Sequence, residues 1–259
     1  MLSPEVRKDE LVEHLNRNIT RLYSWQSTAV KIRASGFPMS LDGTIAVESP
    51  RNFRVRAKFL TSEEADFGSS QEQFWFWMRR SEIKNVITVK HEDAEQAQQV
   101  LQLPFEPDWL MQALGVIPLV PDEFSLIRPD LSSTEVRLVS EHTTAREERI
   151  QKVLYVDTCL GRITRQVLYD SRNRLVAQAV FGNHELDPET GITMPHLIQL
   201  DWPQAEMSLR LKIGPIDVNP LEIPEQAWEL RDVPGYPRID LGEQISKNRN
   251  RSQNPRRDD

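Results

Sequence analysis

The sequence has little cysteine and no long apolar run, and each absence excludes a class of protein. Cys159 is the only cysteine among 259 residues, so the chain has no internal disulfide, and cysteine use does not identify its compartment. No hydrophobic run approaches the roughly 20 residues that a membrane-spanning helix needs. A basic excess is also missing: the formal net charge is -7, which argues against a nucleic-acid partner.

Motifs for catalysis are missing as well. The chain contains no Gly-rich phosphate loop, no G-x-S-x-G and no C-x-x-C. Cys159 lies in a predicted turn without a histidine at a telling spacing, and His91-Glu92-Asp93-Ala94-Glu95 lacks the second histidine of a zinc helix. The paired carboxylates Glu63-Glu64 and Glu147-Glu148 lie in charged stretches typical of a solvated surface. We therefore predict that the protein is not an enzyme and holds no metal or cofactor.

Alternating strands dominate what the sequence does contain. The clearest stretch runs from Lys152 to Ile213, where turn residues separate short apolar runs. In its last part Ile198, Leu200 and Trp202 alternate with Leu197, Gln199 and Asp201. A period of two residues with one apolar face is typical of a strand that is covered on one side. This pattern predicts an antiparallel meander with strands at Val153–Asp157, Ile163–Tyr169, Leu175–Phe181, Leu197–Trp202 and Met207–Ile213.

Further strands are predicted earlier in the chain, at Trp25–Arg33, Thr44–Glu48, Phe53–Phe59, Phe74–Met78, Val86–Val89 and Val136–Glu141. Within Phe53–Phe59 the basic residues Arg54, Arg56 and Lys58 occupy every second position, so we expect them on the wet face. The run Phe74–Met78 is apolar at successive positions, which predicts a sheet covered on both faces there. The polar stretch from Thr61 to Gln71 is predicted to be a loop.

Three helices are expected. Ser3-Pro4-Glu5 predicts the start of the first, which would end near Tyr23. Its apolar stripe consists of Leu11, Val12, Leu15, Ile19 and Leu22. Two short helices follow midway, one from Ala94 to Leu101 and one from Trp109 to Leu114, which Gly115 would end.

Prolines punctuate the chain from Asn219 onward, and the stretch from Glu243 to Asp259 is polar. We predict one folded domain over residues 1–220. Residues 221–259 are predicted to form an irregular and then flexible C-terminal segment.

This order of elements resembles the LolA/LolB-like superfamily of bacterial envelope carriers. The likeness rests on the N-terminal amphipathic helix, on Gly43-Thr44-Ile45-Ala46-Val47 followed by Ser49-Pro50-Arg51-Asn52-Phe53, and on the aromatic strand Phe74-Trp75-Phe76-Trp77. It departs from the family pattern at Ser49, where the carriers place an arginine before the turn proline. The resemblance implies a mainly β fold with some α. It would be a strongly curved antiparallel sheet, an incomplete barrel of about eleven strands, covered by the N-terminal helix and the two inserted helices.

The resemblance also implies that an apolar ligand, a lipid or a lipoprotein acyl chain, binds between the sheet and its helical lid. The residues expected to line this cavity are Phe53, Val55, Phe59, Phe74, Phe76, Trp109, Leu110 and Met111. The same residues are equally consistent with a filled core. In that case the protein would be an envelope scaffold that binds a partner through its sheet edge or its Arg54-Arg56-Lys58 face. A hydrolase ranks last, because no nucleophile and base are recognisable together.

The polar start Met1-Leu2-Ser3-Pro4-Glu5 does not read as a signal peptide. The protein is therefore expected to be cytoplasmic or to lack its leader in this chain. The resemblance favours the second interpretation, with a location in the periplasm or cell envelope and a lipid anchor as an option. The expected partners are a lipid or acyl chain and another envelope protein, with no nucleic acid and no transmembrane segment.

Overall fold

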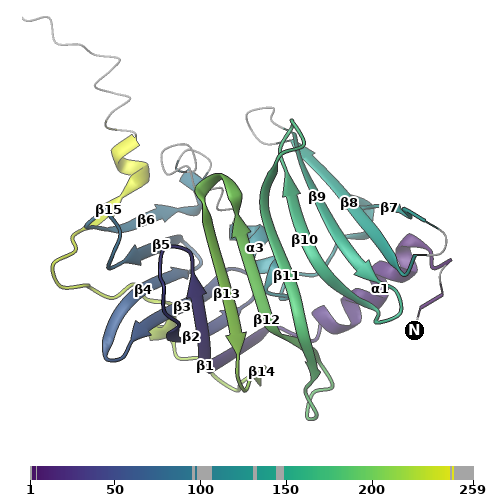
Figure 1. The fold of residues 1–259 in the computed structure, drawn as a ribbon, viewed down its shortest axis with the longest axis horizontal. Coiled ribbons are helices and arrows are strands. Elements are labelled where there is room, and N and C mark those ends of the chain that lie inside the picture. Colours follow the sequence, from purple (N-terminus) through teal and green to yellow (C-terminus); the bar gives the residue numbers. More distant parts are fainter. Residues whose placement is uncertain are drawn as a thin grey trace, which may run out of the picture.

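The computed structural model describes residues 2, 3, 5–94, 97, 107–130, 133–143, 149–245 and 247. In these residues one curved sheet of fifteen strands dominates, and its two ends, β15 and β7, do not pair with each other (Figure 1). The first half contains β1 (Ser24–Ala34), β2 (Leu41–Glu48), β3 (Asn52–Phe59), β4 (Ser62–Ser69), β5 (Gln73–Met78) and β6 (Val86–Lys90). The second half contains β7 (Ser125–Ile127), β8 (Glu135–Thr143), β9 (Arg149–Asp157), β10 (Arg162–Tyr169), β11 (Leu175–Leu186), β12 (Thr193–Trp202) and β13 (Met207–Ile213). The prediction of a mainly β, incomplete barrel is confirmed.

Two meanders meet at one strand pair. Strands β1 to β6 follow one another in space, as do β7 to β13, and β1 pairs antiparallel with β13 to join them. Two short strands complete the sheet: β14 (Asp217–Val218) pairs with β1, and β15 (Arg238–Asp240) pairs parallel with β6. The β6–β15 pair is therefore an exception to the predicted antiparallel order.

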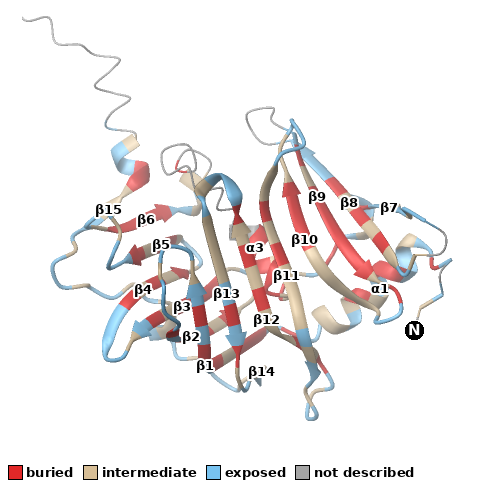
Figure 2. Ribbon diagram, in the orientation of Figure 1, coloured by how far each residue is buried: buried red, intermediate tan, exposed pale blue. Residues whose placement is uncertain are grey.

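The sheet has an inner face, which carries the helices, and an outer face opposite it. Helices α1 (Lys8–Ile19) and α3 (Pro107–Ala113) both lie on the inner side (Figure 1). Leu11, Val12 and Leu15 of α1 pack with Leu138 and Leu154 of the sheet. Figure 2 shows buried segments along the strands and exposed residues at the hairpin ends. Alternation along each strand therefore separates one core-facing set of side chains from an outward set.

Helix α1 begins at Lys8 rather than at the predicted Ser3. The first residues are held against the sheet instead, because the backbone N–H of Leu2 donates to the carbonyl of Thr158 at 3.0 Å. The start at Lys8 is stabilised by Glu10, whose carboxylate accepts the backbone N–H of Arg7 at 3.3 Å. The helix ends at Ile19, a turn before the predicted Tyr23, and β1 begins at Ser24.

Strands β4, β7, β14 and β15 were not predicted, which is why the sheet exceeds the expected strand number. Strand β4 was predicted to be a loop, and this prediction was wrong. Its buried positions are Glu64, Asp66, Gly68 and Ser69, so the hydrophobic pattern of a strand is missing. Strands β7, β14 and β15 are two or three residues long, too short to show any period.

The second inserted helix is confirmed as α3, and Gly115 follows it with a left-handed φ of 82°. The helix predicted from Ala94 to Leu101 falls largely outside the described residues; before it, His91–Asp93 form the 3₁₀ turn η1. No helix among the described residues is long and apolar enough to cross a bilayer.

The boundary at residue 220 stays a prediction, but the described part of the segment that follows is not wholly irregular. It contains the 3₁₀ turn η4 (Glu225–Trp228) and strand β15, and residues 241–245 are helical. Leu241 is buried together with Phe74 and Val89 in one apolar cluster. This segment therefore extends the sheet edge and covers part of the first half.

Candidate functional site

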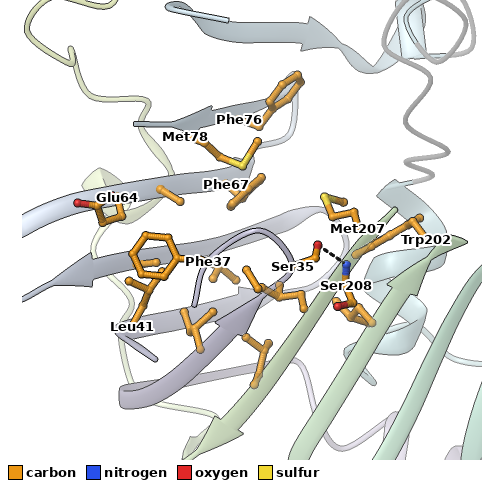
Figure 3. Close-up of a pocket in the computed structure, with 18 of the residues that line it drawn as sticks. Ser35, Phe37, Leu41, Glu64, Phe67, Phe76, Met78, Trp202, Met207 and Ser208 are labelled. Carbon is orange, nitrogen blue, oxygen red and sulfur yellow. Dashed lines mark hydrogen bonds between the residues drawn. The ribbon is translucent and has the colours of Figure 1, made fainter. Parts of the chain in front are cut away.

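An apolar cavity of about 330 Å³ lies on the inner face (Figure 3). Strands β1 to β5 form one wall, β12 and β13 another, and α3 contributes Leu110. Its main apolar side chains are Ile32, Leu41, Ile45, Phe53, Val55, Phe67, Phe74, Phe76, Leu110, Leu114, Leu200, Trp202, Met207 and Leu211. A space with this lining can hold an apolar chain, because such a chain loses no hydrogen bonds when it leaves water.

The structure places the predicted cavity residues in two groups. Phe53, Val55, Phe74, Phe76 and Leu110 line the cavity together. The other three predicted residues lie outside the lining: Phe59 packs edge-on against Phe37, Trp109 packs edge-on against Trp202 with ring centroids 6.2 Å apart, and Met111 is buried in the main core. A ligand-binding role for any of them stays a prediction.

The two faces of β5 lie against different parts of the molecule. Phe74, Phe76 and Met78 lie along the cavity. Trp77 packs on Tyr236 of the C-terminal segment, with ring centroids 5.2 Å apart. The sheet is covered on both faces from Phe74 to Trp77, as predicted from the apolar run, whereas Met78 at the end of the strand is exposed.

Sequence reasoning missed several lining residues. Phe67 belongs to β4, which was predicted to be a loop, and Phe37 belongs to the β1–β2 connection. Trp202 was assigned to the apolar face of its strand but not to a site. Its alternation with Ile198 and Leu200 could have placed it on the inner face, but not in one cavity with Phe53, because the β1–β13 pairing brings the two halves of the sheet together.

Polar side chains stand at one edge of the cavity. Glu64 accepts a hydrogen bond from Arg80 Nε at 3.3 Å, and the Arg80 guanidinium lies 4.7 Å from the centre of the Phe37 ring. This cation–π contact joins the β1–β2 connection to the end of β5. Side-chain contacts among β4, the β1–β2 connection and the residues after β5 therefore form this edge of the cavity.

Arg54 does not lie on a wet face, which corrects the prediction for the Arg54-Arg56-Lys58 stripe. Its side chain is 5% exposed and donates to Asp66 through Nε at 3.0 Å and Nη2 at 2.6 Å. Its Nη1 donates to the carbonyls of Ala227 and Glu229, each at 3.0 Å. The C-terminal segment thus covers this part of the outer face, while Lys58 remains exposed.

Among the residues that the structure describes, the titratable side chains do not form a known catalytic arrangement. Burial, together with the nearby charges of Arg162 and His196, lowers the pKa of His184 to about 4, so this histidine is neutral at pH 7. Cys159 is exposed, and His14 nearby is bonded to the carbonyl of Gly161 at 3.0 Å. Within the described ranges, no group of three or more His, Cys, Asp or Glu residues could hold a metal ion.

Comparison with known proteins finds similarity in fold only. No family model matches the sequence, and no curated protein matches it either. A DUF1329 family protein from Desulfovibrio piger superposes with a TM-score of 0.54 at 11% identity, over 86% of this chain and 95% of the other. A LolA superfamily protein from Nitrosomonas europaea gives 0.53 at 13% identity, over 87% and 98%.

A third solved structure agrees with these two. A putative outer membrane lipoprotein-sorting protein domain from Vibrio parahaemolyticus gives a TM-score of 0.52 at 10% identity, over 85% of this chain and 97% of the other. Near-complete coverage of each relative means that the whole half-barrel is shared, not one hairpin. The chain therefore has a LolA-like fold.

Proposed function

We propose that this protein is a non-enzymatic protein of the bacterial cell envelope that binds an apolar ligand, a lipid or an acyl chain, in the cavity. The observation that carries the proposal is the apolar lining of a space of about 330 Å³ between the sheet and α3. Ligand pockets in proteins span roughly 300–1,000 Å³ and are lined mainly by apolar side chains. The LolA-like fold supports an envelope location, with or without a lipid anchor.

Affinity would come from burial rather than from polar recognition inside the cavity. Each methylene that leaves water contributes about 0.8 kcal/mol. Well-packed apolar walls hold such a chain without specific donors or acceptors. This accounts for a binding protein whose sequence has no recognisable polar motif.

Filling the cavity is expected to weaken uptake. Ala65 lies on β4 in the cavity wall, so Ala65→Trp would occupy space that the ligand needs. We expect at least a tenfold loss of affinity for a fluorescent fatty acid, equivalent to about 1.4 kcal/mol or two methylenes. Phe76→Asp should also weaken binding, because it puts a charge in the apolar wall against which the ligand would pack.

Thr28→Trp is the matched control, because Thr28 is exposed on β1 and outside the cavity lining. Circular dichroism should give the same β signal for all variants. Unchanged uptake by both Ala65→Trp and Phe76→Asp would remove the cavity as the binding site.

The direct experiment is native mass spectrometry of the purified protein, followed by extraction with organic solvent. A fatty acid or phospholipid released at near one per chain would support the proposal. A ligand-free mass together with no uptake of the fluorescent fatty acid would overturn it. That result would favour an envelope scaffold with the same fold. Such a scaffold would have to bind its partner protein through a surface that does not include Arg54, because the C-terminal segment covers this residue.

A further inference from the structure

A second hollow, of about 400 Å³, lies at the ends of β1 and β13. We call it the basic hollow; it is lined by Arg33, Ala34, Ser35, Phe37, Pro38, Gln199, Ser208, Leu209 and Arg210. Arg33 and Arg210 are exposed. They occupy outward positions, since their neighbours Ile32 and Leu211 belong to the inner core. The hollow therefore offers two guanidinium groups and several neutral polar groups to a ligand.

The arrangement of cations here opposes folding stability. Arg33 faces Arg210 directly across the β1–β13 pair, and Lys31 faces Lys212 in the same way. Like charges at directly opposed positions destabilise a sheet. Lys31 has a partner in Asp42, but within the described part of the chain no ion pair involves Arg33, Arg210 or Lys212.

The carboxylates nearest by register do not neutralise the pair. Asp42 lies opposite Lys31, two residues from Arg33, and pairs with Lys31. Asp201 lies opposite Ser208, two residues from Arg210 along β13. It accepts a hydrogen bond from the Gln199 amide at 3.1 Å and forms no ion pair with any described residue. Two like-charged arginines thus remain together in a chain whose net charge is -7. Proteins place such locally unfavourable arrangements mainly at functional sites, and guanidinium groups are suited to binding anions.

The basic hollow adjoins the apolar cavity. Ala34, Ser35, Phe37, Ser208 and Leu209 line both spaces. Two of these shared residues are hydrogen-bonded to each other at the strand ends. The backbone N–H of Ser208 donates to Ser35 Oγ at 2.9 Å (Figure 3), and that of Ser35 donates to the Ser208 carbonyl at 3.0 Å. A molecule with an apolar tail in the cavity would therefore bring its other end over this edge to the two arginines.

We propose that the ligand is an anionic amphiphile whose headgroup is a phosphate. Its acyl chain would lie in the cavity, and its phosphate oxygens would accept hydrogen bonds from Arg33 and Arg210, with Gln199 and Ser208 beside them. Guanidinium groups match phosphate geometry because their donors are planar and can bind two oxygens at once. This inference rests on the proposed function, since it adds a headgroup site to the ligand that the cavity would hold.

The test compares ligands that share a tail and differ in the head. Dodecyl phosphate, dodecanol and inorganic phosphate would each be titrated against a fluorescent fatty acid bound to the delipidated protein, below their micelle concentrations. Wild-type protein should bind dodecyl phosphate about tenfold more tightly than dodecanol, and the double variant R33Q/R210Q should lose that preference while binding dodecanol as before. The preference should also shrink as salt is raised.

K31Q/K212Q is the matched control, because it removes the neighbouring cross-strand pair of cations on the same two strands but outside the basic hollow. It should keep the preference for dodecyl phosphate. An equal loss of the preference in both double variants would overturn the site, because it would show only a general electrostatic attraction to the basic residues.

Failure to bind either dodecyl ligand would overturn the proposed function itself. Equal binding of both ligands by wild-type protein would overturn only the headgroup site. Protection of the Tm by inorganic phosphate alone, without a preference among the dodecyl ligands, would assign the hollow to free phosphate and also overturn the inference.

The like-charge pair makes a second prediction, on stability. Arg210→Gln removes one of two opposed cations, so the ligand-free protein should gain stability at low salt. We expect the Tm to rise by about 1–3 °C, with the gain shrinking at high ionic strength. A fall in Tm at low salt would show that Arg210 has a stabilising partner and would contradict the reading of this pair as a binding site.

Discussion

Asp66→Ala is expected to lower the free energy of unfolding by about 3–5 kcal/mol. The substitution leaves the guanidinium of Arg54 buried at 5% exposure without its carboxylate, and a buried unpaired charge is among the most destabilising changes known. Asp66 also accepts the indole N–H of Trp75 at 3.2 Å, so a second buried donor loses its acceptor. The measurement is equilibrium unfolding in urea, followed by circular dichroism.

Asp232→Ala is the control for this prediction. Asp232 pairs with Arg238 at 2.6 Å, the same N···O distance as the Arg54–Asp66 pair, but its side chain is 93% exposed. Its removal should shift the urea midpoint little, because solvent screens exposed pairs. Equal effects of Asp66→Ala and Asp232→Ala would mean that Arg54 is not buried as described.

A double variant separates the ion pair from the attachment of the C-terminal segment. Arg54→Met with Asp66→Leu removes both charges, so most of the electrostatic penalty of the single variant should disappear. The carbonyls of Ala227 and Glu229 would still lose their donor. The double variant should therefore regain stability while its C-terminal segment becomes more sensitive to limited proteolysis.

The buried Arg54–Asp66 ion pair is also a feature that the sequence alone could not predict. Strands such as β3 and β12 were predicted because apolar side chains at every second position identify one covered face. Strand β4 breaks that rule: Asp66 and Glu64 are buried, and they are satisfied by Arg54 and by Arg79 and Arg80, which come from other elements. A buried polar strand has no local signal, since its partners are found only in the fold.

The cavity shows the same limit. Phe74 and Phe76 could be assigned to one face of their strand, yet whether that face was inner or outer depended on what covers the other one. The cover is Tyr236 and its neighbours, which lie far along the chain in a segment predicted to be irregular. The basic hollow could not be predicted from the sequence either, because Arg33 and Arg210 become neighbours only through the β1–β13 pair that joins the two meanders.

Gly68→Ala is the second change with a large expected effect. A Cβ atom at residue 68 would lie 2.2 Å from Trp75 Cζ2, well inside contact distance, and Trp75 is itself 2% exposed. The indole would have to move, which would break its hydrogen bond to Asp66 and disturb the Arg54 pair. We expect a loss of about 3 kcal/mol in the free energy of unfolding, typical of overpacking in a rigid core.

Gly182→Ala provides the matched control, because Gly182 also lies in a strand and its nearest neighbour would be Leu197 Cδ2 at an ordinary 3.4 Å. That variant should unfold at the wild-type urea concentration or slightly above it, since alanine restricts the unfolded chain more than glycine does. If Gly68→Ala behaved like Gly182→Ala, the Trp75 ring could not rest on the Gly68 backbone. The outer face of the first half would then be packed differently around Gly68 and the two buried acids of β4.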